Sequence, residues 1–549
     1  MDMAMAMAMS SDKMQLIARP CSSFADCPKF LRHLSLGLAL ACSLGHIDAM
    51  AQLDTSAPPV DTSASSLSQP VASGGRFVVP RVSLSETITD NANLATAGKQ
   101  AEQITEISPG IRVSRNAGRI RGYFDYALNG RFLAQNTSAS SFQNALSANG
   151  VVELVERHAF IDMNAGIARQ TISANGVQAG AGQVVSTNQA ESTNYRISPY
   201  IRGNMSQWAD YELRYSFANS ASNSAAISQV NDRSVNLSLK GSRTGSRLGW
   251  TVNASTASSS FSAARTTETD SLRAGLTYAF TPQLNLSATV GTESNNFTTA
   301  DKVSSTISGL GLNWSPTQLT QVSLNRQTRP FGESFGINLS TRGPRTVWQY
   351  SDTQDVTSTP AQLSFGSLGN VYDIFYTQFE TVEPDPIKRA ALVEAFLLSN
   401  GINPKAQVVG GFLTSAVALQ RRQSLSLALL GVRSTVTFLA TRTASSRLDT
   451  ISTAIDDLSN SSLVQQSGFS VNWGHRLTPE SALNVNLAAQ NSSSSTGLVD
   501  SATRSASVGL STRVGPRTTA TVNARRVVSD SNVTPYNETA ITGTLSVQF

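Results

Sequence analysis

The sequence predicts an all-β fold, a transmembrane antiparallel β-barrel of about 22 strands (20–24) with one long helix-containing insertion. Three observations favour this fold class. The chain ends in a strand with one apolar face, its charged residues are few, and short and long connections alternate between the predicted strands.

The last nine residues, ITGTLSVQF, alternate strictly between apolar and polar side chains. A period of two indicates a strand with one apolar and one polar face. The apolar face consists of Ile541, Gly543, Leu545, Val547 and Phe549. Outer-membrane barrels end in such a strand, which closes the sheet against the first strand and leaves no free edge. An edge strand of a soluble β domain is the alternative interpretation.

Charged residues make up 14% of the chain, compared with about 25% in ordinary soluble proteins. After the N-terminal region, no apolar run reaches the length of about 20 residues that a transmembrane helix needs. Spans across a membrane are therefore expected as strands. The net charge is +5 and the arginines are scattered, which does not favour nucleic-acid binding.

The N-terminal 51 residues have the organisation of a signal peptide. A short basic lead precedes the apolar run LSLGLALACSL (34–44), and the sequence Ala-Met-Ala at 49–51 forms a cleavage site. All 3 cysteines lie in this segment. We expect export and cleavage near Ala51, which leaves a mature chain without cysteine. Translation from Met14 and a lipoprotein acylated at Cys42 are the alternatives.

Residues 52–75 are rich in Ser, Thr, Ala and Pro and are expected to form a disordered periplasmic leader. Strand-like alternation begins after this leader, so 76–549 is the predicted barrel. The even strand number agrees with single-chain bacterial barrels. The predicted strands are 77–88, 105–113, 120–132, 146–155, 159–170, 195–203, 208–217, 235–241, 248–257, 272–280, 284–292, 307–314, 319–327, 335–341, 346–352, 422–430, 435–441, 468–473, 483–490, 506–514, 518–527 and 539–549.

The connections between these strands alternate in length. Short links that contain Gly or Pro, such as 281–283 and 515–517, suit tight periplasmic turns. Longer polar stretches, such as 171–194, suit extracellular loops.

The tryptophans all lie close to short links. Tryptophan prefers the level of the lipid headgroups, where its ring is half apolar and its N–H reaches water. We therefore expect a periplasmic aromatic girdle, although core anchors of soluble hairpins are an alternative. The five residues are Trp208, Trp250, Trp314, Trp348 and Trp473.

Charged side chains in two strands share the face opposite to the apolar one. A charge that faces lipid costs up to about 2 to 4 kcal/mol near the midplane. The charged faces should therefore line the lumen, which becomes polar and ionic. The predicted lumen charges are Arg119, Arg121, Asp125, Arg131, Asp210, Glu212 and Arg214.

One stretch, 353–421, interrupts the alternation. Within it Asp385 can cap a helix that begins at Pro386, and Gly401 ends the helical period, which predicts a short helix at about 386–400. The insertion is expected either to pack against the barrel wall or to form a plug or constriction.

Several stretches together resemble one family, the PEP-CTERM-system-associated outer-membrane proteins. They are SETITDNANL from Ser85, TEISPGIR from Thr105, YRISPYIR from Tyr195, RTVWQYSDTQDVT from Arg345, PDPIKRAALVEAFL from Pro384 and GFLTSAVALQRRQ from Gly411. The resemblance implies an outer-membrane β-barrel that accompanies exosortase and exopolysaccharide loci. It implies exopolysaccharide and periplasmic export proteins as partners and supplies no catalytic residue.

The sequence offers no convincing catalytic or metal site. After signal removal only His158 and His475 remain, both at or beside short links, which gives too few ligands for a transition metal. The aspartate pair at 456–457 and the pair Asp352 and Asp355 lack the spacing of a calcium loop. We predict a protein that is not an enzyme and uses no cofactor.

The favoured hypothesis is a porin-like conduit in the outer membrane, associated with exopolysaccharide export. It requires outer-membrane lipid and the barrel-assembly machinery as partners, and no nucleic acid. The alternatives are a non-conducting structural barrel that anchors secretion machinery and a soluble or fibrous extracellular β protein.

Overall fold

The structure is a computed structural model. It describes residues 76–549 with gaps at 137–139, 178–185, 207, 225–226, 243–245, 263, 449–455, 496–499 and 533. Between 358 and 417 it describes only Tyr376, Arg389, Val393, 412–414 and Val417. The predicted signal peptide and leader (1–75) lie outside the described residues.

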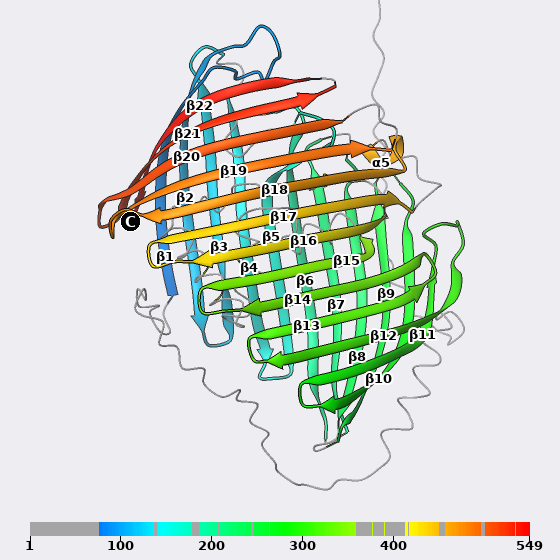
Figure 1. The fold of residues 1–549 in the computed structure, drawn as a ribbon. Coiled ribbons are helices and arrows are strands. Elements are labelled where there is room, and N and C mark those ends of the chain that lie inside the picture. The colour runs from blue at the N-terminus through cyan, green and yellow to red at the C-terminus, as the bar shows by residue number, and fades with distance from the viewer. Residues whose placement is uncertain are drawn as a thin grey trace, which may run out of the picture. The chain divides into compact units, whose positions relative to one another are not determined.

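One antiparallel sheet of 22 strands closes on itself (Figure 1), which confirms the predicted antiparallel β-barrel and its strand number. A short helix, α5 (Asp457–Asn460), lies between the strands β17 and β18. The strands are β1 (Arg76–Thr89), β2 (Glu102–Ala117), β3 (Ile120–Leu133), β4 (Ser141–Val155), β5 (Ala159–Thr171), β6 (Gln189–Met205), β7 (Ala209–Ser222), β8 (Val230–Ser242), β9 (Leu248–Phe261), β10 (Thr267–Thr281), β11 (Leu284–Asn295), β12 (Val303–Thr317), β13 (Thr320–Arg329), β14 (Gly332–Arg342), β15 (Thr346–Thr357), β16 (Ala418–Leu430), β17 (Ser434–Arg447), β18 (Leu463–Arg476), β19 (Ser481–Ser494), β20 (Ser501–Gly515), β21 (Thr518–Ser531) and β22 (Tyr536–Gln548).

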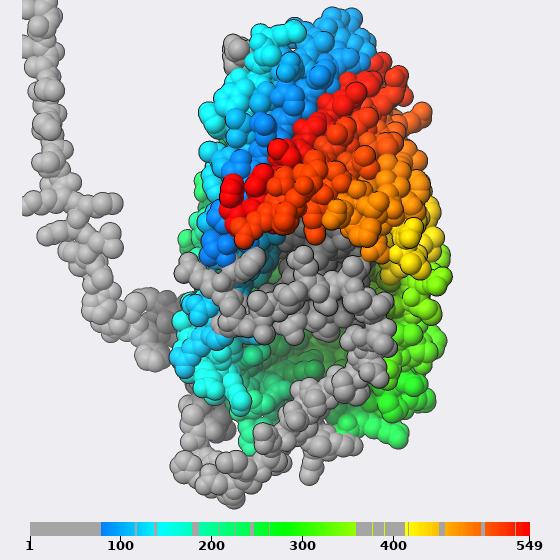
Figure 2. All heavy atoms as spheres, turned by 90° about the vertical axis from the view of Figure 1, so that its left-hand side faces the viewer, coloured from blue at the N-terminus to red at the C-terminus, as the bar shows by residue number. Residues whose placement is uncertain are grey.

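The seam of the barrel joins its first and last strands. β1 and β22 pair in register from Arg81 opposite Gln548 to Thr89 opposite Ala540. Figure 2 shows the seam where the blue beginning of the barrel lies against its red end. The Phe549 amide donates to the Pro80 carbonyl at 2.9 Å. The C-terminal strand therefore leaves no open edge.

Hydroxyl contacts hold the polar side of this seam together. Ser85 and Thr87 contact Thr544 and Thr542, with 2.9 Å between the hydroxyl oxygens of each pair. On the other side of the same strands the apolar residues are exposed, with Leu84 at 47% and Ile541 at 56%. Neighbouring residues thus alternate between a polar inner wall and an apolar outer wall, as a period of two requires.

The two ends of the barrel differ in their connections. At one end, the short-turn end, tight links such as 118–119 and 516–517 join the strands, and Gly118 adopts φ +68°. At the other, the long-loop end, the connections include 90–101 and 172–188. Among the described residues, no helix has both the length and the hydrophobicity needed to cross a membrane.

The predicted insertion at 353–421 is too wide. β15 continues to Thr357 and β16 begins at Ala418, so both ends of that stretch are strand residues. Charged side chains such as Arg421 hid the strand ends, because they break the apolar alternation. Apart from Arg389 and Val393, the helix expected at about 386–400 lies outside the described residues and stays a prediction.

Candidate functional site: the channel lining and its mouth

The inner wall carries arginines that bridge neighbouring strands through carboxylates. In the first cluster, Asp125 of β3 accepts hydrogen bonds from Arg81 of β1 at 2.9 Å and from Arg112 of β2 at 2.9 Å. The side chain of Asp125 is 15% exposed. Two cations share one carboxylate, so this part of the wall keeps an excess of positive charge.

A second cluster combines charges with aromatic rings. Arg214 of β7 contacts Asp162 at 2.5 Å and Glu212 at 2.9 Å. Its guanidinium lies 3.8 Å from the ring centroid of Tyr200. That ring stacks on Phe160 with 5.0 Å between centroids. The guanidinium is thus fixed by ion pairs at its edge and by a ring at its face.

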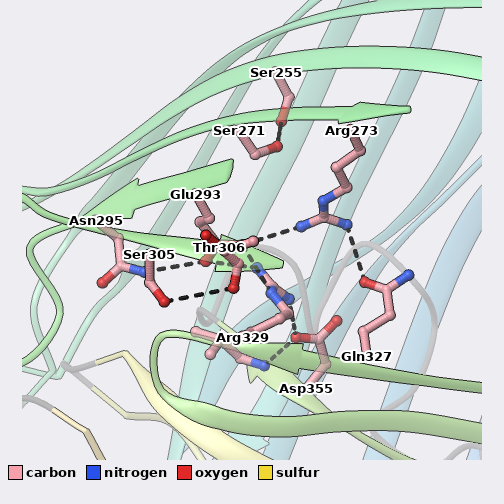
Figure 3. A network of polar contacts seen from close by, with 11 residues as sticks. Ser255, Ser271, Arg273, Glu293, Asn295, Ser305, Thr306, Gln327, Arg329 and Asp355 are labelled. Atoms are coloured by element: carbon pink, nitrogen blue, oxygen red, sulfur yellow. Dashed lines mark hydrogen bonds and ion pairs between the residues drawn. The ribbon is translucent and has the colours of Figure 1, made fainter. Parts of the chain in front are cut away.

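A third cluster is centred on Glu293 of β11 (Figure 3), whose side chain is 0% exposed. Arg329 of β13 donates to both carboxylate oxygens of Glu293, at 2.9 and 3.0 Å. Arg273 of β10 reaches the same carboxylate at 3.1 Å. Arg329 also contacts Asp355 of β15 at 2.6 Å. The burial of Glu293 is compensated by these two arginines, as an ionised buried carboxylate requires.

The structure places the predicted lumen charges in two settings. Four of them form ion pairs: Asp125, Glu212 and Arg214 as described, and Arg131 with Glu106 at 2.5 Å. The other three lie near the short-turn end. There Asp210 accepts a hydrogen bond from Asn204 at 2.6 Å, and Arg119 and Arg121 are exposed.

Sequence reasoning missed most of the ion-pair partners. Only the register of neighbouring strands brings them together. The missed residues are Arg81, Arg112, Glu106, Asp162, Arg273, Glu293, Arg329, Asp355, Arg525 and Glu538.

All five tryptophans are exposed. Trp208 precedes β7 and is 75% exposed, and the other four lie in strands close to the short-turn end. These four point to the same side of the sheet as exposed apolar neighbours. Trp250, for example, is opposite Leu276, which is 56% exposed. The structure thus places the rings of Trp250, Trp314, Trp348 and Trp473 on the outer wall. Trp208 lies in the turn before β7.

The loop between β5 and β6 (172–188), here called the mouth loop, reaches the far side of the long-loop end. Ser173 Oγ donates to one carboxylate oxygen of Asp457 in α5 at 2.8 Å. The Ala174 amide donates to the other at 2.6 Å. β5 and β17 lie almost half the ring apart, because each strand pairs with its sequence neighbours. This contact therefore crosses the mouth of the barrel.

Apolar packing accompanies the hydrogen bonds of the mouth loop. A buried group, here called the mouth cluster, unites three connections at the long-loop end with the inner wall. Asn175 accepts a hydrogen bond from Ser492 of β19 at 3.1 Å, and Val177 packs on Leu94, Val527 and Tyr536. The mouth cluster consists of Ala174, Phe412, Ala418, Leu458 and Val464.

A second buried group lies at the same end of the barrel. Val230, Phe261, Phe297 and Val417 pack together, with Phe331 partly buried against them. The ring of Phe331 also lies 4.5 Å from the guanidinium of Arg329. Apolar side chains thus adjoin the ionic lining at the mouth, and the described loops are held by packing as well as by hydrogen bonds.

The carboxyl group of Asp457 is the titratable centre of the mouth contact. Burial raises the pKa of Asp457 above its usual value, although the hydrogen bonds from Ser173 and Ala174 oppose the rise. Its neighbour Asp456 caps α5 and accepts a hydrogen bond from Thr414 at 2.8 Å. One turn of helix therefore ties together three connections of the long-loop end.

The two histidines lie at the short-turn end. His158 Nδ1 is 2.7 Å from the Glu156 carbonyl, and His475 Nδ1 is 2.7 Å from the Ser434 hydroxyl directly opposite it in the sheet. Within the described part of the chain, no carboxylate is recorded that orients either ring. The same residues contain no group of three or more His, Cys, Asp or Glu side chains able to hold a metal ion.

No family model matches the chain, and no curated protein matches it either. Solved structures do. FrpB, an iron transporter of Neisseria meningitidis, has a TM-score of 0.44 at 8% identity, covering 86% of this chain and 81% of that one. The siderophore receptor PirA of Pseudomonas aeruginosa has 0.40 at 8%, covering 86% and 80%. OccK2 of the same species has 0.34 at 8%, covering 86% and 98%. These likenesses concern the fold alone.

Proposed function

We propose that the protein is an outer-membrane β-barrel of a Gram-negative bacterium and acts as a porin-like conduit. One observation carries the proposal: a single closed sheet has an apolar outer wall and an ionic inner wall. Among β structures, only a closed barrel satisfies all its backbone groups in lipid. Charged side chains on the inner wall stay hydrated by water in the lumen, whereas the same charges facing lipid would destabilise the barrel.

The connections give the orientation. Short turns belong in the periplasm and long loops outside in barrels of this kind. The described part of the mouth loop (172–177 and 186–188) then lies at the extracellular opening, and its contact with α5 limits passage. The conduit is accordingly gated, and the ionic clusters on the inner wall favour polar and charged solutes over apolar ones.

The resemblance to the PEP-CTERM-associated family supports a more specific cargo. In that reading the conduit serves exopolysaccharide export, with periplasmic export proteins as partners and the barrel-assembly machinery inserting the chain. A hydrated polymer with acidic groups would find positive charge at Asp125, where two arginines share one carboxylate. The local excess of arginine at this cluster suits acidic groups, whereas the Arg214 cluster, with two carboxylates, has the opposite balance.

Planar-bilayer recording tests the conduit. Purified protein should conduct, and the current should fall when the cognate polymer is added. A variant lacking 358–411, with the mouth loop retained, shows whether that insertion restricts the pore. A protein that conducts no current even after 358–411 and the mouth loop are both removed contradicts the proposal. So does a protein that fractionates without detergent and migrates identically in gels with and without boiling.

The second candidate is a non-conducting barrel that anchors the secretion machinery. The contacts across the mouth favour it, because the mouth loop is held by partly buried hydrogen bonds and by the mouth cluster. Deletion of the gene separates the two functions. Loss of a conduit stops polymer release while partner proteins keep their positions, whereas loss of a scaffold displaces the partners first.

A further inference from the structure

Charged residues on the outer wall of β13–β16 are paired with each other. Arg421 of β16 contacts Asp352 of β15 at 2.8 Å, and Asp352 is only 3% exposed. Arg326 of β13 forms an ion pair with Glu333 of β14. These side chains have the outward parity, since Trp348 and Leu425 on the same faces of β15 and β16 are 42% exposed. On this side of the barrel, each outward arginine has its counter-ion within the protein.

The outer wall of β20 and β21 carries two arginines without such partners. Arg504 and Arg526, here called the arginine pair, are both exposed. Among the described residues, neither has a recorded hydrogen bond or ion pair. Val508 on β20 and Val522 on β21 share their parity and are 49% and 57% exposed, which places the arginine pair on the outer wall.

The register brings the two guanidinium groups within reach of one anion. Ala506 lies opposite Arg526, and Arg504 lies opposite Val528, so the two arginines are diagonal neighbours. Diagonal neighbours on one face of a sheet are about 7 to 8 Å apart at the backbone. Two flexible side chains at that separation can converge on one phosphate group, which accepts several guanidinium hydrogen bonds at once.

The height of the arginine pair matches a lipid headgroup level. Arg526 lies eight residues from Thr518, the first residue of β21 at the short-turn end. A tilted strand climbs about 20 Å over that length, which approaches the far boundary of an apolar band about 25 Å tall. Trp473, near the short-turn end of β18, marks the other boundary of the apolar band.

An open hollow of about 520 Å³, lined mostly by residues with polar side chains, lies on the long-loop side of the arginine pair. Ala502 and Asp530 line it and are opposite each other in the sheet, two and four residues beyond Arg504 and Arg526. Hydroxyl, amide and carboxylate groups of this kind form hydrogen bonds with sugar hydroxyls. Its polar lining includes Asn491, Ser492, Ser493, Asp500, Asp530 and Asn532.

We propose that the outer surface of β19–β22 binds a phosphorylated glycolipid of the outer leaflet. The arginine pair takes the phosphate, the hollow takes the sugar, and the apolar wall around Val508 and Val522 takes the acyl chains. This inference rests on the outer-membrane placement proposed above and not on conduction. The charge supports this occupant, since exposed cations at the edge of lipid attract anionic headgroups. Asp530 is also diagonal to Arg504, but no ion pair joins the two side chains in the described structure.

Two other outward arginines do not form such a site. Arg233 of β8 is exposed, but it has no second arginine diagonal to it. Arg442 of β17 donates to Gln465 at 3.2 Å and is likewise single. Unlike Arg233 and Arg442, the arginine pair combines two neighbouring guanidinium groups with an adjacent hollow.

Lipid A binding to the full-length mature barrel in detergent tests the proposal. Diphosphorylated lipid A is titrated against wild type and the double variant Arg504→Gln/Arg526→Gln, and retained lipid is measured by native mass spectrometry. The double variant should bind about tenfold more weakly or worse, as expected from the loss of charge-assisted hydrogen bonds. The control Arg326→Gln/Glu333→Gln removes a paired arginine together with its acid and should bind like wild type.

A second arm assigns the effect to the phosphates. Dephosphorylated lipid A should bind wild type as weakly as diphosphorylated lipid A binds the double variant. Arg504→Lys/Arg526→Lys keeps the charge and should retain part of the affinity, and slower migration after boiling shows that each variant is folded. Equal binding by wild type and the folded double variant overturns the proposal, as does equal loss in the control. A barrel that binds lipid A in this way yet never conducts overturns only the conduit.

Discussion

The two ends of the barrel are held together by interactions of different range. At the short-turn end the contacts lie within one connection or join it to the adjacent strand. Gly431 donates to the Ser434 carbonyl at 2.7 Å, and Arg476 donates to the Arg433 carbonyl at 2.8 Å. At the long-loop end the mouth loop depends on Asp457, which is 284 positions from Ser173 in the sequence. The short-turn end is therefore as stable as the sheet, whereas the mouth can open without unfolding a strand. We therefore expect a gate at the long-loop end, where the contacts join residues distant in sequence and can break while the strands stay paired.

The largest effect on this difference should come from the apolar side of the mouth contact. Leu458 is 1% exposed in the mouth cluster, and Leu458→Ala should weaken docking of the mouth loop by about 2 to 5 kcal/mol. Hydrogen exchange should rise at 172–177 while the barrel strands remain protected. If strand protection falls equally, the mouth and the sheet form one cooperative unit and the contrast fails.

Removal of the carboxylate at the mouth should have the next largest effect. Asp457→Ala deletes the acceptor of two hydrogen bonds, from Ser173 and Ala174, and should cost about 1 to 3 kcal/mol of docking. The expected result is a longer open time in bilayer recordings. Asp301→Ala, in the exposed loop between β11 and β12 at the same end, serves as the control and should leave the open time unchanged.

A smaller effect is expected at the short-turn end. Gly118 has φ +68°, and an added Cβ would meet no atom within 4 Å. Gly118→Ala should thus cost about 1 kcal/mol from backbone conformation alone, and Gly118→Asn should cost less, because Asn tolerates this region. Urea unfolding of the barrel measures both. Any change in conductance would show that the two ends are coupled, contrary to the comparison above.

The same contrast explains what the sequence could predict. All 22 predicted strands correspond to observed ones, and they agree best at the short-turn end, as at 284–292 against β11 from Leu284. At the long-loop end the predictions stop early. β10 begins at Thr267 instead of 272, because Glu268 and Asp270 face outward above the lipid and interrupt the apolar alternation while the backbone ladder continues.

The residues of the candidate site also differ in how far the sequence could predict them. Alternation along one strand placed Asp125 and Glu212 on a polar face, because their side-chain direction follows from local period. Arg81, the partner of Asp125, is brought to it by pairing between strands. Arg214, the partner of Glu212, lies on the same strand and shared its predicted charged face. The contact of Ala174 with Asp457 joins two polar loops and has no sequence period, so only the folded chain reveals it.

The smallest predicted effect is a dependence of the mouth on pH. Because the pKa of Asp457 is raised when the mouth loop is docked, the docked state binds a proton more tightly than the open state does. Docking is therefore strongest below the ordinary pKa of an aspartate, about 3.9, and weakens as pH rises through the raised value. Conductance should accordingly increase from acidic to neutral pH. Asp457→Asn keeps an acceptor but carries no charge, so its conductance should stay near the acidic wild-type level throughout. If that variant retains the wild-type pH dependence, the titrating group lies elsewhere.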